Sequence, residues 1–209
     1  MADTLLVLDF GSQYNQLIAR RIREKGIYSV LKPHEMTADQ IRQIPDLKGI
    51  VFSGGPRSVY AEDAFTCDPE IFRLGVPILG ICYGMQLCCK HFGGVIARSE
   101  ETKEYGKMPI AVLDECPLFS NLPQRQDVWM SHGDHVETLP DGFRIAAKSD
   151  GDVPAAVYDP ARQIYCVQFH PEVRHTVYGN DIIANFAFEI CHARANWTME
   201  SYLEMQIRK

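Results

Sequence analysis

At residues 76–84 the chain contains the stretch Val76-Pro77-Ile78-Leu79-Gly80-Ile81-Cys82-Tyr83-Gly84, which joins an apolar segment to a glycine-flanked cysteine. Short apolar runs of this kind are typical of strands that a parallel sheet buries on both faces. The G-x-C-x-G pattern that follows is typical of a nucleophile elbow, in which small residues allow a sharp turn from strand to helix. The stretch therefore predicts that Cys82 protrudes at the edge of a sheet.

The predicted turn places Cys82 at the N-terminus of a helix. Exposed amides and the helix dipole favour a thiolate there, so a thiol whose ordinary pKa is about 8.5 becomes a usable nucleophile at neutral pH. The alternative is an unreactive core residue, because free cysteines are commonly buried. The spacing of the elbow favours the nucleophile.

A candidate base for this nucleophile lies far downstream. Residues 163–169 alternate and are rich in β-formers, which predicts a strand that ends at His170. Pro171 ends the ladder, and Glu172 can then accept a hydrogen bond from the imidazole. Such a carboxylate fixes the tautomer and stabilises the imidazolium, which completes a nucleophile-base-acid triad. An isolated H-P-E would more simply be a strand-end histidine and a solvated glutamate, but the cysteine elbow favours the triad.

A third motif, at residues 49–56, is an apolar strand followed by Ser-Gly-Gly-Pro. Glycines let backbone amides approach a substrate oxygen closely, and each amide aimed at an oxyanion is worth roughly a hundred- to a thousand-fold in rate. The expected donors are the amides of Gly55 and Tyr83. An ordinary strand-to-helix turn is the alternative. The phosphate loop of ATP pyrophosphatases is rejected, because Pro56 and Arg57 stand where that loop has a free amide and an acidic residue.

Together these motifs resemble the glutaminase domains of GMP synthases, which are class I (triad) glutamine amidotransferases. The resemblance covers nearly the whole chain, in the family's order. Its segments are Leu8-Asp9-Phe10-Gly11-Ser12-Gln13-Tyr14, Ser53-Gly54-Gly55-Pro56, Gly80-Ile81-Cys82-Tyr83-Gly84-Met85-Gln86, Asp127-Val128-Trp129-Met130-Ser131-His132-Gly133-Asp134 and Gln168-Phe169-His170-Pro171-Glu172-Val173. The first and fourth segments point to GMP synthases rather than to other amidotransferases.

The resemblance implies a role for each catalytic position. Cys82 would be the nucleophile, His170 the general base and acid, and Glu172 the carboxylate that orients the histidine. Gly55 and Tyr83 would be the oxyanion donors.

Three further residues would hold the substrate L-glutamine. The family implies that the side chain of Gln86 contacts it, and that the backbone around Ser131 and His132 holds its amino-acid end.

The resemblance also implies a partner. The glutaminase would supply ammonia to an ATP pyrophosphatase (GMP synthetase) domain or subunit, which uses ATP and Mg²⁺ to aminate xanthosine monophosphate. The glutaminase itself would need no cofactor. We expect an amidotransferase domain at residues 1–195 and a helical connector toward that partner at 196–209. The chain would then be an excised domain or a separate subunit, and its connector-like tail favours the former.

Three alternative functions share these motifs. A glutaminase subunit of anthranilate synthase type would differ mainly in its partner. A γ-glutamyl hydrolase or cysteine peptidase would use the same triad on a larger substrate. A regulatory subunit without chemistry is disfavoured, because the triad positions and both glycines are intact.

Composition sets wider limits. The 209 residues suffice for one α/β domain, and 46% hydrophobic with 23% charged residues is an ordinary globular balance. A formal charge of −6 without a basic run argues against binding to nucleic acid or to membrane surfaces. No signal peptide or membrane span is expected. Seven cysteines without regular spacing suggest a reducing, cytoplasmic setting.

Metal binding is the main competing chemistry. Candidate ligand pairs are Cys88-Cys89 with His91, His132 with His135, and His170 with His175. None has the paired spacing of a zinc site, so no metal is expected.

The order of elements predicts the fold class. Strands are expected at 5–10, 28–32, 49–53 and 77–81, with a helix at 13–25 and a helix after the loops that follow 49–53 and 77–81. In the helix at 13–25, Arg20 and Arg23 lie off the apolar stripe and are expected to be solvated. This alternation predicts a flavodoxin-like α/β domain, a mostly parallel sheet with helices on both faces and its active site at the carboxyl ends of the strands. After Gly94 we expect a small antiparallel sheet at 95–157, a final strand at 164–169, and helices at 180–193 and 199–207.

Overall fold

A computed structural model describes residues 1–98 and 100–208 of the chain. One nine-stranded sheet has the order β2-β1-β3-β4-β11-β10-β9-β6-β7, and β5 and β8 form a separate two-stranded sheet. The strands are β1 (Thr4–Asp9), β2 (Tyr28–Pro33), β3 (Leu47–Phe52), β4 (Ile78–Ile81), β5 (Val95–Arg98), β6 (Glu104–Val112), β7 (Arg125–His132), β8 (Asp134–Thr138), β9 (Arg144–Ser149), β10 (Pro154–Asp159) and β11 (Ile164–Val167).

The described residues also form five α-helices and several shorter helical turns, of which α4 and α5 follow the last strand. The helices are α1 (Asn15–Arg23), α2 (Ala38–Arg42), α3 (Tyr83–His91), α4 (Gly179–Ala184), which continues as a π-helical turn at Asn185–Ile190, and α5 (Met199–Ile207). The 3-10 helices are Pro69–Arg73, Glu100–Thr102 and Pro117–Phe119.

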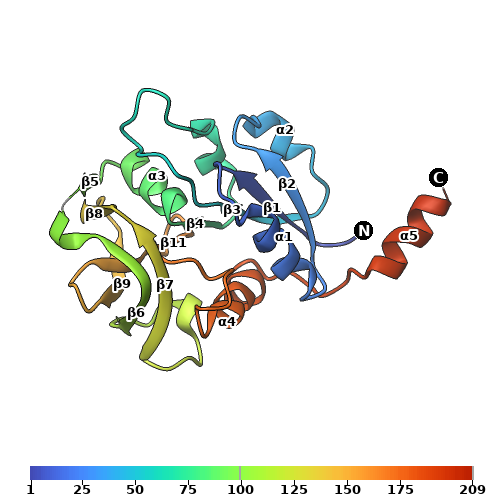
Figure 1. Ribbon diagram of the computed structural model, residues 1–209. Coiled ribbons are helices and arrows are strands. Elements are labelled where there is room, and N and C mark those ends of the chain that lie inside the picture. Colours follow the sequence, from blue (N-terminus) through green and yellow to red (C-terminus); the bar gives the residue numbers. More distant parts are fainter. Residues whose placement is uncertain (99, 209) are drawn as a thin grey trace.

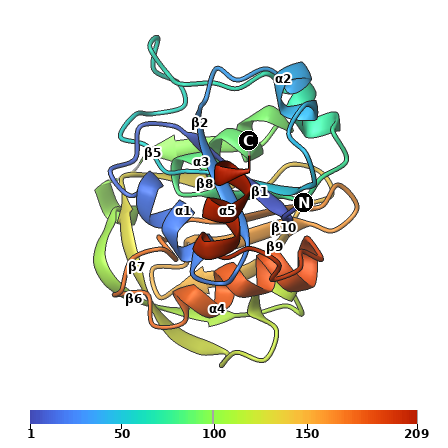
Figure 2. The ribbon, with the colours of Figure 1, turned by 90° about the vertical axis from the view of Figure 1, so that its right-hand side faces the viewer.

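The parallel half of the sheet is buried on both faces. In β1, Leu5 and Val7 belong to the hydrophobic cluster on one face, and Leu6 and Leu8 belong to the cluster on the other. The first cluster is covered by α1 and α4 and the second by α2 and α3, so α2 and α4 lie on opposite sides of the sheet (Figure 2). An unbroken apolar run is what a strand between two helical layers requires.

The two halves of the sheet differ in direction. The strands β2, β1, β3, β4 and β11 pair in parallel, whereas β10, β9, β6 and β7 continue the same sheet with antiparallel pairs. The predicted α/β class and the small antiparallel sheet are confirmed, the latter as β5 with β8. Most of the antiparallel strands extend the main sheet (Figure 1), because β11 pairs in parallel with β4 on one side and antiparallel with β10 on the other.

Two local expectations differ from the structure. After β3 the predicted helix is only the short 3-10 turn Pro69–Arg73, which Asp68 caps and which ends before Gly75, where the backbone has a positive φ of 77°. Arg23 is not simply solvated, because its guanidinium donates to the hydroxyl and the carbonyl of Ser29. It also lies over the rings of Tyr28 and Trp197.

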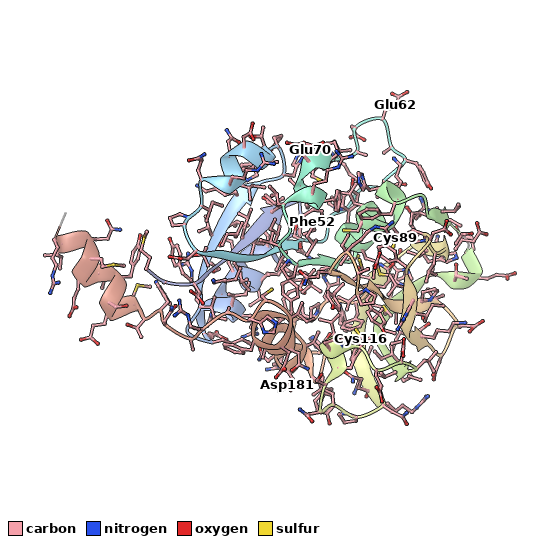
Figure 3. The ribbon with its side chains drawn as sticks, turned by 180° about the vertical axis from the view of Figure 1, so that it is seen from behind. Phe52, Glu62, Glu70, Cys89, Cys116 and Asp181 are labelled. Carbon is pink, nitrogen blue, oxygen red and sulfur yellow. The ribbon has the colours of Figure 1, made fainter. Side chains whose placement is uncertain are left out.

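The segment 196–208 leaves the body of the domain in two stages. Trp197 is buried, and its amide donates to the carbonyl of Gly26 at 2.8 Å. Helix α5 then buries none of its residues and stands away from the sheet (Figures 1 and 3). Lys209, the last residue of the predicted connector, lies outside the described residues. None of the described helices combines the length and apolarity needed to cross a bilayer.

The turn between β4 and α3 depends on close backbone contact, which gives a first prediction. A methyl group at Gly80 would lie 2.7 Å from the carbonyl oxygen of Gly84. We expect Gly80→Ala to lower the free energy of unfolding by about 2 kcal/mol or more, because backbone atoms must shift. Gly151→Ala is the control, since a methyl group there would lie 3.4 Å from its nearest neighbour, Oε2 of Glu104. Its free energy of unfolding should stay within about 0.5 kcal/mol of the wild-type value. Urea unfolding measures both, and equal midpoints would contradict this packing.

Candidate active site

Four neighbouring parallel strands end at one edge of the sheet. In the paired register Leu8 of β1 is opposite Phe52 of β3, Phe52 is opposite Gly80, and Ile81 of β4 is opposite Val167 of β11. The residues that follow these strands therefore meet although they are far apart in sequence. Phe52 itself is buried in the interior, whereas Glu62 lies at the outer tip of the loop that follows β3 (Figure 3).

Cys82 lies at the turn from β4 into α3. Its φ of 53° and ψ of −105° are rare for a residue with a side chain. The turn is held because the Cys82 amide donates to the carbonyl of Val167 at 2.8 Å. Gly84 also lies so close to the end of β3 that a methyl group there would be 2.6 Å from the carbonyl oxygen of Phe52. This is the geometry of a nucleophile elbow, with the Cys82 side chain 6% exposed.

His170 and Glu172 form a buried pair beside the elbow. The Nδ1 of His170 lies 2.7 Å from Oε1 of Glu172, and Glu172 is 0% exposed. Its other oxygen, Oε2, has no hydrogen-bond partner within residues 1–98 and 100–208. The imidazole is thus the hydrogen-bond donor that the structure shows for this carboxylate.

The surroundings of His170 favour its protonated form. Burial by itself disfavours the imidazolium, but interactions with the thiol of Cys82 and the carboxylate of Glu172 outweigh it and raise the pKa of His170 to about 10. The ring of Tyr14 packs edge-on against the imidazole, with ring centroids 5.6 Å apart.

Gly54 lies close to both Cys82 and the imidazole of His170. A methyl group at Gly54 would be 3.0 Å from Cε1 of His170 and 3.6 Å from Cβ of Cys82. Cys82 and the imidazole are therefore near neighbours, and a larger residue at Gly54 would be in tight contact with the imidazole.

The peptide that joins Gly54 to Gly55 is held by Ser53. The Ser53 hydroxyl accepts a hydrogen bond from the Phe10 amide at 2.9 Å and donates one to the Gly54 carbonyl at 2.9 Å. The carbonyl and the N–H of a trans peptide point in opposite directions, so this bond directs the Gly55 N–H away from Ser53. Tyr83, whose amide is the other expected donor, is the first residue of α3, where an N–H has no partner within the helix.

A pocket of about 500 Å³ opens at this edge, within the usual range for small-molecule sites. It is lined by seven of the residues predicted from sequence: Gly55, Cys82, Tyr83, Gln86, Ser131, His132 and His170. Glu172 lies behind His170 and does not line it. Arg57, Arg98 and Asp134 add charge to the wall.

The far wall of the pocket comes from the end of β7. The thiol of Cys82 donates to the Ser131 carbonyl at 3.7 Å. The buried His132 ring donates from Nδ1 to the carbonyl of Asp134 at 2.9 Å, and its Nε2 lies 3.0 Å from Glu104. A proton must lie between Nε2 and the Glu104 carboxyl group, because two lone pairs would repel at that distance.

Gln86 is more constrained than its predicted role suggests. Its Nε2 donates to the carbonyl of Asp134 at 3.0 Å and to Oε1 of Gln168 at 3.3 Å. Both amide hydrogens are therefore used within the protein. Only its carbonyl oxygen is left to contact a substrate.

Sequence reasoning missed three polar residues of the site: Ser53, Glu104 and Gln168. Ser53 and Gln168 are members of the quoted S-G-G-P and Q-F-H-P-E motifs, so their positions beside the predicted site residues were a usable signal. Glu104 had no such signal, because it meets His132 only through the pairing of β6 with β7.

The described residues contain no group of three or more His, Cys, Asp or Glu side chains that could hold a metal.

Each of the seven cysteines is a free thiol. Burial raises the pKa of Cys67 and Cys116 to about 12. It also raises the pKa of Cys88 and Cys191. A hydrogen bond with Cys166, together with burial, raises the pKa of Cys89, and burial together with a hydrogen bond with Cys88 raises that of Cys166.

Comparison with known proteins gives a consistent picture. The sequence profile of the family "Glutamine amidotransferase class-I" matches residues 6–190. The chain is 56% identical over 207 residues to glutamine-hydrolysing GMP synthases of Bacillus cytotoxicus and Geobacillus kaustophilus, and covers 99% of its own length but 40% of theirs.

Two solved structures have a similar fold over nearly the whole chain. The chain matches a Thermoplasma acidophilum protein, described as one subunit of a GMP synthase, with a TM-score of 0.80 and 32% identity over 99% of this chain and 98% of that one. It shares its fold with a glutamine amidotransferase of Thermotoga maritima at a TM-score of 0.68 and 20% identity, over 99% and 93% of the two chains.

The raised pKa of His170 predicts how stability depends on pH. The folded-state value of about 10 lies above the unfolded value of about 6.5, so the stability from protonating His170 is complete below pH 6.5 and is lost as pH rises to about 10. We expect the unfolding free energy of the wild type to fall toward that of His170→Gln across this window. Urea unfolding at a series of pH values measures the difference, and a difference independent of pH would contradict the prediction.

Proposed function

The chain belongs to the class I glutamine amidotransferase family, and on that premise we propose that it is the glutamine-hydrolysing part of a GMP synthase. The observation that carries the proposal is the buried His170–Glu172 pair beside a cysteine held at a strained turn. The identity of 56% to two GMP synthases favours this assignment over a glutaminase of the anthranilate synthase type.

In the proposed reaction His170 takes the proton of the Cys82 thiol, and the thiolate attacks the side-chain amide carbon of L-glutamine. A bond forms between sulfur and that carbon, and the carbonyl oxygen becomes an oxyanion. His170 gives its proton to the amide nitrogen, the carbon–nitrogen bond breaks, and ammonia leaves. The product of this half-reaction is a γ-glutamyl thioester.

The second half-reaction uses the same residues in reverse roles. His170 takes a proton from water, whose oxygen attacks the thioester carbon. The sulfur–carbon bond breaks, glutamate leaves and the thiolate is restored. Glu172 keeps the imidazole oriented and stabilises its charge in both steps, which its short hydrogen bond and complete burial support.

The substrate would lie in the pocket between the two halves of the sheet. The amides of Gly55 and Tyr83 would donate to the oxyanion, and the Ser53 hydroxyl supports this by fixing the peptide before Gly55. The backbone at Ser131 and His132, at the end of β7, would hold the amino-acid end of glutamine, and the Gln86 carbonyl oxygen would also contact the substrate, since all three residues line the pocket.

The whole protein would contain more than this domain. The chain spans 40% of the length of the two GMP synthases it matches. We propose that residues 1–195 are the amidotransferase domain and that 196–209 lead toward an ATP pyrophosphatase domain. That domain would use ATP and Mg²⁺ to aminate xanthosine monophosphate to GMP with the ammonia made here. Seven free cysteines support a reducing, cytoplasmic setting.

Replacing the nucleophile tests the proposed chemistry. We expect Cys82→Ala to lower glutamine hydrolysis by at least about a thousandfold, because triad residues act as a unit. The melting temperature should change by no more than about 4 °C, since only one small side chain is lost. Cys191→Ala, at another buried thiol, is the matched control and should keep its activity. Glutamate release measures turnover, and full activity of Cys82→Ala would exclude this mechanism.

The proposed partner gives a separate prediction. We expect the isolated chain to hydrolyse glutamine slowly, because free ammonia is wasted without an acceptor. Joining it to a GMP synthetase domain, with ATP, Mg²⁺ and xanthosine monophosphate present, should raise the rate at least about tenfold, a coupling of roughly 1.4 kcal/mol. Glutamate formation with and without xanthosine monophosphate measures the effect. An unchanged rate, with the nucleotide still aminated from added ammonia, would contradict the coupling.

A further inference from the structure

A buried polar network reaches the sulfur of Cys82 through the side chain of Gln168. Gln168 donates from Nε2 to Sγ of Cys82 at 3.6 Å, and its Oε1 accepts from Gln86 at 3.3 Å. Gln86 in turn donates to the Asp134 carbonyl, which also accepts from His132. None of the steps of the triad mechanism uses Gln168.

The carbonyl oxygen of Asp134 decides which groups donate and which accept in the hydrogen bonds from Gln86 to Cys82. The Asp134 carbonyl can only accept, so the Gln86 atom that faces it must be the amide nitrogen. That nitrogen also faces Gln168, so the Gln168 atom it meets must be the carbonyl oxygen. The amide nitrogen of Gln168 is then the atom left facing the sulfur of Cys82. The network therefore presents an N–H donor to the sulfur.

The backbone holds this donor in place. Cys82 follows β4 and Gln168 follows β11, directly after the paired residues Ile81 and Val167. The Cys82 amide donates to Val167 at 2.8 Å, and the Gln168 amide donates to the Ala155 carbonyl at 2.8 Å. Gln168 is 0% exposed, so water does not compete for its side-chain donor.

How strongly the Gln168 amide interacts with the sulfur depends on whether the sulfur is a thiol or a thiolate. As a thiol, Cys82 donates its proton to the Ser131 carbonyl. When the proton leaves, that carbonyl can no longer bond to the sulfur, whereas the amide of Gln168 bonds more strongly to the negative charge. The same charge returns to the sulfur when the thioester is cleaved.

We propose that Gln168 is a further catalytic residue, whose side-chain amide stabilises the Cys82 thiolate before attack and as the leaving group of the thioester. Gln86 and Asp134 are positioning residues that fix which way the Gln168 amide faces. The proposal rests on the proposed function of Cys82 as the nucleophile.

The test measures the reactivity of Cys82 directly, without glutamine. Iodoacetamide is small and uncharged, so its reaction needs none of the contacts that hold an amino acid. The rate of modification at Cys82, located by mass spectrometry, is compared in wild type, Gln168→Met and Gln126→Met. Gln126 is the matched control, a buried glutamine of β7 whose amide donates to the Pro123 carbonyl.

We expect Gln168→Met to react about tenfold more slowly near neutral pH, the factor for about 1.4 kcal/mol, at the low end for a hydrogen bond to a charged group. In Gln126→Met the rate of modification at Cys82 should stay within about twofold of the wild-type rate. Thermal unfolding shows whether each variant is folded. An equal rate at Cys82 in folded Gln168→Met would overturn the role of Gln168. A wild-type Cys82 no more reactive than the buried cysteines would instead overturn its function as the nucleophile.

A second variant keeps the shape of the side chain in case Gln168→Met does not fold. Gln168→Glu can still accept from Gln86, but once ionised it repels a thiolate. Its rate relative to wild type should therefore be lowest near pH 6 and rise toward one as pH approaches 10, where the sulfur is ionised in both proteins. The other titratable groups near the sulfur, His170 with Glu172 and His132 with Glu104, are the same in both proteins. A relative rate of one at every pH would overturn the proposal.

Discussion

At Cys82 the backbone adopts a φ of 53° and a ψ of −105°, and the rest of the site depends on this turn. The conformation is unfavourable for a residue with a Cβ, by about 1–3 kcal/mol. It persists for two reasons. The amide of Cys82 is hydrogen-bonded to β11, and Gly80 and Gly84 have no side chain, which lets the backbones of β3, β4 and α3 lie in contact. Strain at one residue is thus maintained by the packing of β3, β4, β11 and α3 around it.

The site is built where the two halves of the sheet meet. The parallel half supplies the thiol, the imidazole and the two candidate oxyanion amides, each at the end of a strand or the start of a helix. The antiparallel half supplies the opposite wall through the ends of β6 and β7. The buried network from Glu104 to Gln168 joins these two halves across the pocket. A change in the position of β7 would therefore affect the sulfur, both through this network and through the direct bonds of β7 to the Cys82 thiol and the His170 amide.

Much of this could be predicted from local sequence. The apolar run before Cys82 and the alternation of strands with a helix indicated the parallel sheet, and the cysteine, histidine and glycine motifs indicated residues that the structure brings to one pocket. Their roles stay proposals. The pairing of β11 with both β4 and β10 was not predictable, because nothing in a single strand specifies two different neighbours. The same holds for Glu104, which meets His132 only through strand register, and for Arg23, whose partner Ser29 lies on the next strand. Contacts of this kind depend on tertiary packing, which periodicity does not describe.

The buried thiols described above have a consequence for chemical damage. Six of the seven sulfurs have a pKa raised by their surroundings and remain protonated at physiological pH, so they are poor targets for peroxide. Cys82 lines the pocket of the candidate site, whereas Cys116, which lines a second pocket, is one of the six whose pKa is raised. Oxidation to a sulfenic acid would therefore begin at the residue that carries the proposed reaction, and such a molecule would lose its chemistry while keeping its fold. In a stressed cell, inactive and folded copies would accumulate before unfolded ones.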